Sequence, residues 1–402
     1  MKGAKNAALK AVAAALLSRE KWTITNFPCI EDTSRMLEIV EDLGVKVNRG
    51  GDRVEIQAGE ISENKLNNEL SRKLRASIML AGPILARTGE VEMPYPGGCV
   101  IGKRPIDMFI DGFQRLGAEV EWKDSYFVLR AKKLKGARIF FPKISVTATE
   151  SMMMTSVLAE GETVLENAAM EPEVPALADF LNKIGADISG AGTPTIKING
   201  VKEIGGGKFE MIPDRIEAGT FVIMGILTGG EIKITKCNPG HIKAMLAVLE
   251  KTGADFETKQ GEILVRSGKE IKAVRYITTH EYPGLATDLQ APLTLLMTQA
   301  KGLSLIHDSI FEGRLFFTDI LNTMGADIIM CDPHRVVVNG PAKLCARKIV
   351  SPDLRAGITL VLAGLIAKGE TRIENIYQID RGYERIEERL QRLGAEIKRV
   401  EA

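Results

Sequence analysis

The residues best suited to chemistry lie in one short stretch, PYPGGCVIGKRP, at residues 94–105. Its three glycines and three prolines favour a surface loop over a packed core. Lys103 and Arg104 follow Cys99 closely, and nearby cations favour the thiolate and lower the pKa of a cysteine. This spacing predicts a reactive Cys99 thiol in a cationic loop.

The same stretch satisfies the phosphate-binding pattern GxxxxGK from Gly97 to Lys103. In that pattern a Ser or Thr should follow the lysine and bind Mg²⁺, but Arg104 and Pro105 follow here. The Pro-Tyr-Pro before the glycines also disfavours the strand that should precede such a loop. We therefore reject the nucleotide-kinase interpretation of this motif.

The cysteines and histidines show no metal-ligand spacing. The five cysteines are odd in number, widely spaced and lack a CxxC pair, and the four histidines form no HExxH pattern. We predict no structural metal and a reducing cytoplasmic location. The cysteines other than Cys99 lie in or beside apolar or strand-like segments, so we interpret them as small core residues. They are Cys29, Cys237, Cys331 and Cys345.

The composition excludes several classes of protein. Fifty-three Lys and Arg against 52 Asp and Glu give a net charge of +1 over 402 residues, which provides no field to attract nucleic acid or an acidic membrane. The N-terminal apolar run resembles a signal peptide, but Lys10 interrupts it and no small-residue cleavage site follows. No uncharged segment reaches the roughly 18 residues that span a bilayer. We expect neither nucleic acid nor membrane as a partner, and the oligomeric state stays open.

A repeated signature organises the scaffold that must position these residues. A helix-period segment ends six times in the pattern x-Gly-[Ala/Val]-[Asp/Glu/Lys]-apolar, and the glycines are 73, 68, 68, 72 and 69 residues apart. Each glycine is predicted to end a helix in the left-handed conformation and to lead into a strand. The six glycines are Gly44, Gly117, Gly185, Gly253, Gly325 and Gly394.

A second helix, apolar nearly all round, recurs between these signatures. We expect its six copies to be buried and surrounded by six sheets. Polar or charged residues stand at the start of each copy, where they act either as helix caps or as parts of an anion site built from helix N-termini. The copies begin near Lys5, Arg75, Thr149, Glu217, Asp288 and Arg355.

Six units of about 70 residues, grouped three plus three, predict two domains. We place the first domain at residues 5–213, including the loop 94–105, and the second at residues 214–402 together with residues 1–4. No Pro/Ser-rich linker separates the two halves, so we expect a short hinge and a cleft between them.

Ordered motifs along nearly the whole chain carry a resemblance to a known family. They read GAKNAAL from residue 3, LRAS from 74, PGGCVIGKRPID from 96, KISV from 143, PDRIEAGT from 213, TDLQAPLT from 287, DLRAG from 353 and IDRGYERIE from 379. The chain resembles the UDP-N-acetylglucosamine 1-carboxyvinyltransferases. The resemblance implies an α/β (α+β) fold of two inside-out α/β barrel domains, each of three βαβαββ repeats.

The resemblance also implies an activity. It is the transfer of the enolpyruvyl group from phosphoenolpyruvate to the 3-hydroxyl of UDP-N-acetylglucosamine with release of phosphate, by addition and then elimination. This is the committed step of peptidoglycan precursor synthesis, and it takes place in the cytoplasm without a metal or other cofactor.

The resemblance assigns roles to individual residues. Cys99 matches the family's cysteine, which acts as the acid that protonates the methylene carbon and is the target of fosfomycin. Asp288 matches the base at the sugar hydroxyl. Lys5, Arg104 and Arg381 would clamp the phosphate and carboxylate of phosphoenolpyruvate. Further matched positions orient the intermediate, bind the nucleotide sugar or offer guanidinium groups to anions. They are Asn6, Arg75, Pro105, Ile106, Asp107, Met108, Lys143, Ile144, Ser145, Val146, Ile310, Arg314, Asp353 and Arg355.

The sequence departs from the family pattern in places. A segment with a first strand usually precedes GAKN, so either the start codon lies earlier or one barrel has an unpaired edge. Three alternatives therefore stay open: a 5-enolpyruvylshikimate-3-phosphate synthase, which PGGCVIGKRP argues against, a non-catalytic or regulatory paralogue that binds UDP-N-acetylglucosamine, and an enolpyruvyl transferase with another acceptor. Six positions near the expected site also differ: Ser34, Thr147, Met170, Ala176, Gly313 and Gln378.

Overall fold

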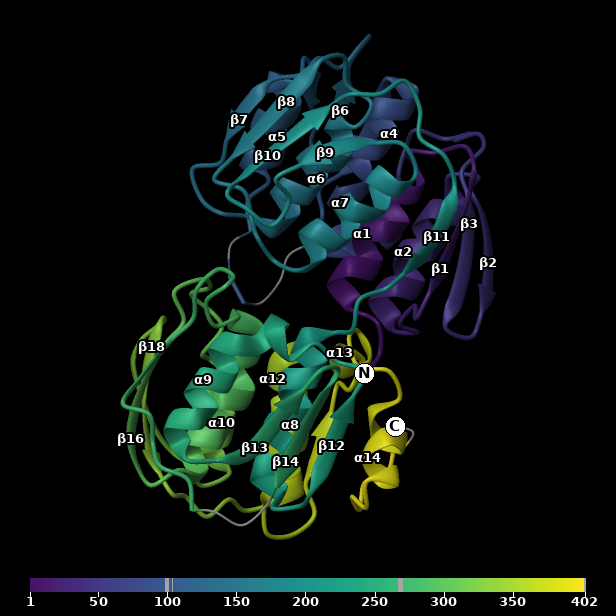
Figure 1. Ribbon diagram of the computed structural model, residues 1–402. Helices are drawn as coiled ribbons and strands as arrows, with labels where there is room; N and C mark the ends of the chain where they lie inside the picture. Colours follow the sequence, from purple (N-terminus) through teal and green to yellow (C-terminus); the bar gives the residue numbers. More distant parts are fainter. Residues whose placement is uncertain (98–100, 103, 267–269, 401–402) are drawn as a thin grey trace. The chain divides into compact units, whose positions relative to one another are not determined.

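The computed structural model describes residues 1–97, 101–102, 104–266 and 270–400. The predicted reactive thiol of Cys99 and the neighbouring Lys103 lie outside the described residues. The chain forms two compact units (Figure 1). The N-terminal unit is built from residues between Gly3 and Ile212, and the C-terminal unit runs from Pro213 onward and also includes Met1, Lys2, Ile101 and Gly102.

The N-terminal unit places buried helices inside three sheets. Helices α1, α4 and α6 pack within the unit, and strands form the sheets β11-β1-β3-β2, β4-β6-β5 and β7-β8-β10-β9. Its elements are α1 (Lys5–Ala15), β1 (Lys21–Thr25), α2 (Glu31–Asp42), β2 (Lys46–Gly50), β3 (Arg53–Gln57), α3 (Asn68–Lys73), η1 (Arg75–Leu80), α4 (Ala81–Thr88), β4 (Glu90–Pro94), α5 (Asp107–Arg115), β5 (Glu119–Trp122), β6 (Tyr126–Arg130), β7 (Arg138–Phe140), α6 (Val146–Ser156), β8 (Glu162–Glu166), α7 (Glu173–Lys183), β9 (Asp187–Ser189), β10 (Thr195–Asn199) and β11 (Gly207–Glu210).

The C-terminal unit repeats this plan. Helix α10 packs against α8 and α12, and strands form the sheets β12-β14-β13, β15-β16-β18-β17 and β19-β20 (Figure 1). Its elements are α8 (Arg215–Thr228), β12 (Ile232–Thr235), η2 (Pro239–Ile242), α9 (Lys243–Thr252), β13 (Asp255–Lys259), β14 (Glu262–Arg266), β15 (Tyr276–Thr278), η3 (Thr287–Leu289), α10 (Gln290–Gln299), β16 (Gly302–His307), α11 (Thr318–Thr323), β17 (Asp327–Asp332), β18 (Arg335–Gly340), β19 (Lys348–Val350), α12 (Leu354–Ile366), β20 (Arg372–Glu374), α13 (Tyr377–Asp380) and α14 (Ile386–Arg392).

The strand pairing inside each sheet is mixed. Hairpin neighbours pair antiparallel, as in β17 with β18, where Ile329 lies opposite Val337. The strand that enters from the preceding repeat pairs parallel, as β7 does with β8 and β15 with β16. Parallel pairing needs a crossover, and in these two pairs the buried helices α6 and α10 supply it. The sheets lie on the outside of each unit and enclose the apolar helices. Helices that are hydrophobic all round are thereby buried.

The predicted glycine turns are confirmed. All six signature glycines have a positive φ, between +78° and +113°. A left-handed residue ends each helix because its amide can bond back to the last turn, and glycine adopts this φ without a steric cost from Cβ. The predicted buried helices and six sheets are also present among the described residues.

Two predictions about local structure are wrong. The sixth signature, at Gly394, leads into no strand in residues 395–400, because that segment has no partner strand among the described residues and a single strand cannot satisfy its backbone groups. Of the cysteines interpreted as core residues, only Cys237 is buried, whereas three are exposed. Cys331 lies on the exposed side of β17, and Cys29 and Cys345 lie outside the helices and strands. The exposed cysteines are Cys29, Cys331 and Cys345.

Candidate active site

Lys5 begins helix α1 in the N-terminal unit, and its ammonium group is buried against a carboxylate. Lys5 Nζ lies 2.7 Å from Asp32 Oδ2, and the two side chains are only 9% and 5% exposed. Asp32 is in the first turn of α2, where the helix dipole favours a negative charge. The ion pair therefore holds Lys5 at the end of its helix, beside the half-buried Asn6.

Arg75 holds the base of the loop 94–105. Its guanidinium donates to the backbone carbonyl oxygens of Pro96 (3.5 Å), Pro105 (3.4 Å) and Arg104. Carbonyls from both ends of the loop thus meet one side chain at the first residue of η1. Arg75 was predicted as a substrate ligand, and these three hydrogen bonds connect it to the loop backbone.

The remaining predicted residues of the N-terminal unit lie at helix starts. Asp107 is the first residue of α5, and Val146 is the first residue of α6. Ser145 caps α6, since its hydroxyl accepts from the amide of Ala148 at 3.3 Å. The other predicted positions around these two starts are exposed or half-buried, so a ligand can reach them. They are Arg104, Pro105, Ile106, Met108, Lys143 and Ile144.

Asp288 is the centre of a charge cluster in the C-terminal unit. Its Oδ1 lies 3.0 Å from Arg314 Nη2, and its Oδ2 lies 2.8 Å from Arg355 Nη2. The two guanidinium side chains are 4% and 6% exposed, whereas Asp288 is 24% exposed. The carboxylate is therefore the part of this cluster that solvent, or a substrate, can reach.

The cluster shifts the pKa of its members. Burial alone would raise the pKa of Asp288, but Arg355 and Arg314 outweigh it and hold that pKa well below its usual value. Burial alone would likewise lower the pKa of Arg355, and Asp288 reverses the direction. Arg215 contributes a further lowering of the Asp288 pKa. Asp288 is therefore ionised and electrostatically stabilised at neutral pH.

Asp353 supports this cluster through a helix cap, and Arg381 makes a hydrogen bond on the neighbouring helix α13. Asp353 caps α12, because its Oδ1 accepts from the amides of Arg355 at 2.8 Å and Ala356 at 3.1 Å. Arg381 follows α13, and its Nη1 donates to Gln378 Oε1 at 3.0 Å. Gln378, one of the six divergent positions, thus supplies a hydrogen-bond acceptor for a predicted substrate ligand.

A buried carboxylate that sequence reasoning missed shapes the loop around Ile310. Asp308 Oδ1 accepts from the amides of Ile310 at 3.0 Å and Phe311 at 2.9 Å, and its Oδ2 accepts from the Thr287 hydroxyl at 2.6 Å. Asp308 is fully buried. It therefore ties the Ile310 loop to the residue immediately before Asp288, and its position after strand β16 is the signal that could have identified it.

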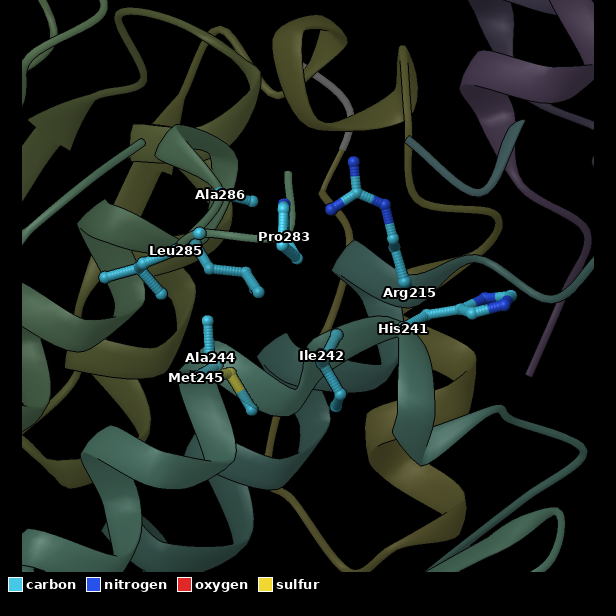
Figure 2. Close-up of a pocket in the computed structure, with 10 residues that line it drawn as sticks. Arg215, His241, Ile242, Ala244, Met245, Pro283, Leu285 and Ala286 are labelled. Carbon is cyan, nitrogen blue, oxygen red and sulfur yellow. The ribbon is translucent and has the colours of Figure 1, made fainter. Parts of the chain in front are cut away.

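A small pocket adjoins the Asp288 segment. It is lined by Arg215, His241, Met245 and Leu285, among others, and Figure 2 shows Arg215 and His241 as its long polar side chains and Met245 and Leu285 on the apolar side. The chain segment that leads to Asp288 forms one wall, since Ala286 also lines the pocket. Arg215 stacks over the Tyr282 ring at 5.8 Å. Arg215 lies in the predicted motif PDRIEAGT, but its electrostatic effect on Asp288 emerges only from the folded chain.

The tertiary structure brings some predicted residues together and leaves others apart. Asp288, Arg314 and Arg355 form one cluster within the C-terminal unit, and Asp353 caps the helix that carries Arg355. In the N-terminal unit, Arg75 meets Arg104 and Pro105, and Lys5 pairs with Asp32. No group of three or more His, Cys, Asp and Glu suited to holding a metal occurs among the described residues.

Comparison with known proteins decides the family. The chain matches the family described as EPSP synthase (3-phosphoshikimate 1-carboxyvinyltransferase) over residues 1–390. A UDP-N-acetylglucosamine 1-carboxyvinyltransferase of Koribacter versatilis is 46% identical over 402 residues, covering 99% of this chain and 92% of the relative. The chain belongs to the UDP-N-acetylglucosamine 1-carboxyvinyltransferase family. A transferase of the same name from Solibacter usitatus is 44% identical and covers 99% of this chain and 96% of that relative.

Solved structures show that the family's fold is present here. The enolpyruvyl transferase NikO from Streptomyces tendae superposes with a TM-score of 0.90 at 24% identity, covering 99% of this chain and 94% of that one. An EPSP synthase from Acinetobacter baumannii superposes with a TM-score of 0.75 at 18% identity over 98% of this chain and 94% of that one. These likenesses confirm the predicted enolpyruvyl transferase fold. Within the described part of the chain, no helix has the length and apolar character required to span a membrane.

Proposed function

We propose that this member of the transferase family moves the enolpyruvyl group of phosphoenolpyruvate onto the 3-hydroxyl of UDP-N-acetylglucosamine, with release of phosphate. One observation carries the proposal: relatives that are 40–46% identical over nearly the full chain bear the name UDP-N-acetylglucosamine 1-carboxyvinyltransferase. The reaction would commit the nucleotide sugar to peptidoglycan synthesis in the cytoplasm. The divergent positions do not favour a non-catalytic paralogue, because the cluster of Asp288, Arg314 and Arg355 is intact.

The chemistry of the described residues supports this reaction. Phosphoenolpyruvate carries a phosphate and a carboxylate, and guanidinium groups pair with both in a forked geometry. Arg314, Arg355 and Arg381 offer such groups in the C-terminal unit, and Lys5 and Arg104 offer cations in the N-terminal unit. Cys99 would act as the acid that protonates the methylene carbon.

Asp288 would act as the base toward the sugar hydroxyl. A carboxylate held by two guanidinium groups is a weak base, because its pKa is depressed. When an anionic substrate shares Arg314 and Arg355, the attraction that each guanidinium exerts on Asp288 falls and the pKa of Asp288 rises. The geometry therefore links substrate binding to the basicity of the carboxylate, and Asp353 would keep Arg355 in place through the helix cap.

The decisive experiment is an assay of phosphate release from phosphoenolpyruvate. Purified protein should release phosphate when UDP-N-acetylglucosamine is present and none when the nucleotide sugar is omitted. In parallel assays, UDP-glucose or shikimate 3-phosphate replaces UDP-N-acetylglucosamine, which tests whether the protein uses another acceptor. If phosphoenolpyruvate releases phosphate only when shikimate 3-phosphate is the acceptor, the synthase alternative is favoured. No release with any acceptor would support a non-catalytic role.

The proposed role of Cys99 leads to a prediction about fosfomycin. The wild-type protein should gain one fosfomycin adduct by mass spectrometry, and Cys99→Ser should gain none, because a serine hydroxyl is a far weaker nucleophile than a thiolate. Cys331→Ser, at an exposed cysteine of the C-terminal unit, is the matched control and should label like wild type. An adduct that persists in Cys99→Ser would contradict the assignment.

A further inference from the structure

A chain of hydrogen bonds starts at the guanidinium nitrogen of Arg355 that does not contact Asp288. Arg355 Nη1 lies 3.4 Å from Tyr383 Oη, which lies 3.0 Å from Thr220 Oγ1. Thr220 Oγ1 in turn donates to the backbone carbonyl of Ile216 at 2.8 Å. The chain connects α8, α12 and the segment between α13 and α14 within the C-terminal unit (Figure 1).

The direction of each hydrogen bond in this chain is determined. The Thr220 hydroxyl gives its proton to Ile216, so it accepts from the Tyr383 hydroxyl. The Tyr383 oxygen then has lone pairs left, and a guanidinium can only donate. The order is therefore Arg355 to Tyr383 to Thr220 to the helix backbone, with every donor matched to an acceptor.

These groups are out of solvent. Tyr383 is 1% exposed, Thr220 is 2% exposed and Arg355 is 5% exposed. Burial raises the pKa of Tyr383, with Arg355 opposing the rise, so the phenol keeps the proton that it donates to Thr220. The ring of Tyr383 also lies 5.9 Å from the Arg355 guanidinium carbon, a cation–π distance. A buried phenol whose ring lies this close to a guanidinium and whose oxygen accepts from it restricts how that group can rotate.

Arg355 is thereby held at two points. Its Nη2 bonds to Asp288 at 2.8 Å, and its Nη1 faces Tyr383. A side chain with several rotatable bonds loses its preferred orientation when only one of two anchors remains. The plane of the guanidinium, and hence its alignment with the Asp288 carboxylate, depends on the second anchor.

We propose that Tyr383 and Thr220 are positioning residues that orient Arg355 for its pairing with Asp288 and with the substrate anion. This inference rests on the proposed function, in which Arg355 and Asp288 act on the substrates. Neither Tyr383 nor Thr220 touches the reacting atoms in this scheme, and both act through Arg355.

The test uses hydroxyl deletions in the full-length protein. Tyr383→Phe keeps the ring and removes the hydroxyl, Thr220→Val removes the next acceptor, and Thr220→Ser keeps it. Thr228→Val is the matched control, because Thr228 lies on the same helix and makes the same bond to the carbonyl four residues earlier, here that of Met224. Thermal unfolding of each variant establishes that it is folded.

The expected result is a selective loss of turnover. Tyr383→Phe should lower kcat about tenfold, since one hydrogen bond to a charged group is lost, and should move the acid limb of the pH profile to higher pH. Thr220→Val should lower kcat by about threefold and shift the pH profile in the same direction. Thr220→Ser should have wild-type turnover. Thr228→Val should leave both kcat and the pH profile unchanged. An unshifted pH profile in a folded Tyr383→Phe protein would overturn the proposal.

A second measurement does not depend on turnover. In ¹⁵N-arginine NMR, the guanidinium resonance of Arg355, assigned with Arg355→Lys, should show hindered rotation in wild type and in Thr228→Val, and faster rotation in Tyr383→Phe. Unchanged rotation in Tyr383→Phe would overturn the proposal even if the wild-type protein released no phosphate. Absence of phosphate release together with faster rotation would instead count against the proposed function alone.

Discussion

At the scale of single residues, the site depends on how buried charged side chains are paired. Asp288 is stabilised by two buried guanidinium groups, and Lys5 is stabilised by the buried Asp32. Buried ion pairs cost desolvation energy, so removing one partner is far more damaging than removing an exposed one. The consequences can be measured at Asp288 and at Glu150.

Replacement of Asp288 should affect both stability and turnover. Asp288→Asn removes the carboxylate that pairs with both Arg314 and Arg355 and should lower the free energy of unfolding by about 3 kcal/mol. It also removes the proposed base, so kcat should fall by about 100-fold. Urea unfolding and the phosphate-release assay measure the two effects. Asp332→Asn, which alters an exposed pair with Arg335, is the control and should change neither.

The outcome separates a structural role from a catalytic one. If Asp288→Asn loses stability but keeps its turnover, the carboxylate serves only to neutralise the arginines. If turnover falls while the unfolding energy is unchanged, the argument that the two arginines need a counter-charge is wrong.

Glu150 should make stability depend on pH. Burial raises the pKa of Glu150 to about 7 from its ordinary 4.5, Lys10 opposes the rise from 2.9 Å, and Glu173 adds to it. Because the unfolded state ionises first, stability should fall as pH rises from about 4.5 to about 7 and stay level above that, by up to about 3 kcal/mol. Urea unfolding across this pH window should show the slope.

Two variants identify the source of this slope. Glu150→Gln cannot ionise and should flatten the curve between about pH 4.5 and pH 7, although it lowers stability overall because Lys10 loses its partner. Glu160→Gln, at an exposed glutamate paired with Lys133, should retain the wild-type slope. Equal slopes in wild type and Glu150→Gln would show that another group titrates.

At the scale of secondary structure, helix starts position the site. Asp353 caps α12 and Asp214 caps α8, each with a carboxylate oxygen that accepts from two backbone amides. For these two residues the capping interpretation made from sequence holds. The cap has a functional consequence at α12, because Arg355 is the second residue of that helix.

Removal of the α12 cap should therefore affect the candidate active site. Asp353→Ala should lower the free energy of unfolding by about 1 kcal/mol and reduce turnover, since the first turn that carries Arg355 loses its anchor. Asp353→Asn retains an oxygen acceptor and should stay close to wild type in unfolding energy. Urea unfolding and the phosphate-release assay are the measurements, and an unchanged stability in Asp353→Ala would contradict the capping role.

At the scale of the whole molecule, each unit has its own hydrophobic core. One cluster of buried residues lies between Ala4 and Met211, and the other lies between Ile216 and Leu390. A separate core allows each unit to unfold as its own cooperative transition. Stability measurements on this chain should therefore resolve two events.

Matched core variants test this expectation. Leu165→Ala in the N-terminal core and Leu360→Ala in the C-terminal core both truncate fully buried side chains. Each should lower the free energy of unfolding of its own unit by about 3 kcal/mol. The midpoint temperature of one calorimetric transition should fall by on the order of 5–10 °C, while that of the other transition stays unchanged. A single transition that moves with either variant would show that the two units unfold together.

Much of the fold could be predicted from local patterns. The six glycines after helical segments predicted six left-handed turns, and all six have positive φ. The apolar helices predicted burial, and the Met152 to Met154 run is fully buried. The ordered motifs identified the family. These features depend on residues close together in the sequence, where helix period, strand alternation and the steric freedom of glycine act directly.

The tertiary structure alone decided how the site residues are paired. Arg355 and Asp288 are 67 positions apart, and Tyr383 and Thr220 are 163 apart, so no local periodicity relates them. The predictions of a strand after Gly394 and of three buried cysteines were wrong for the same reason. Strand pairing and burial depend on which distant segments become neighbours. Residue types and their order therefore determined the helices, the turns and the family. The packing of distant segments determined which carboxylate faces which cation, and hence which groups can do the chemistry.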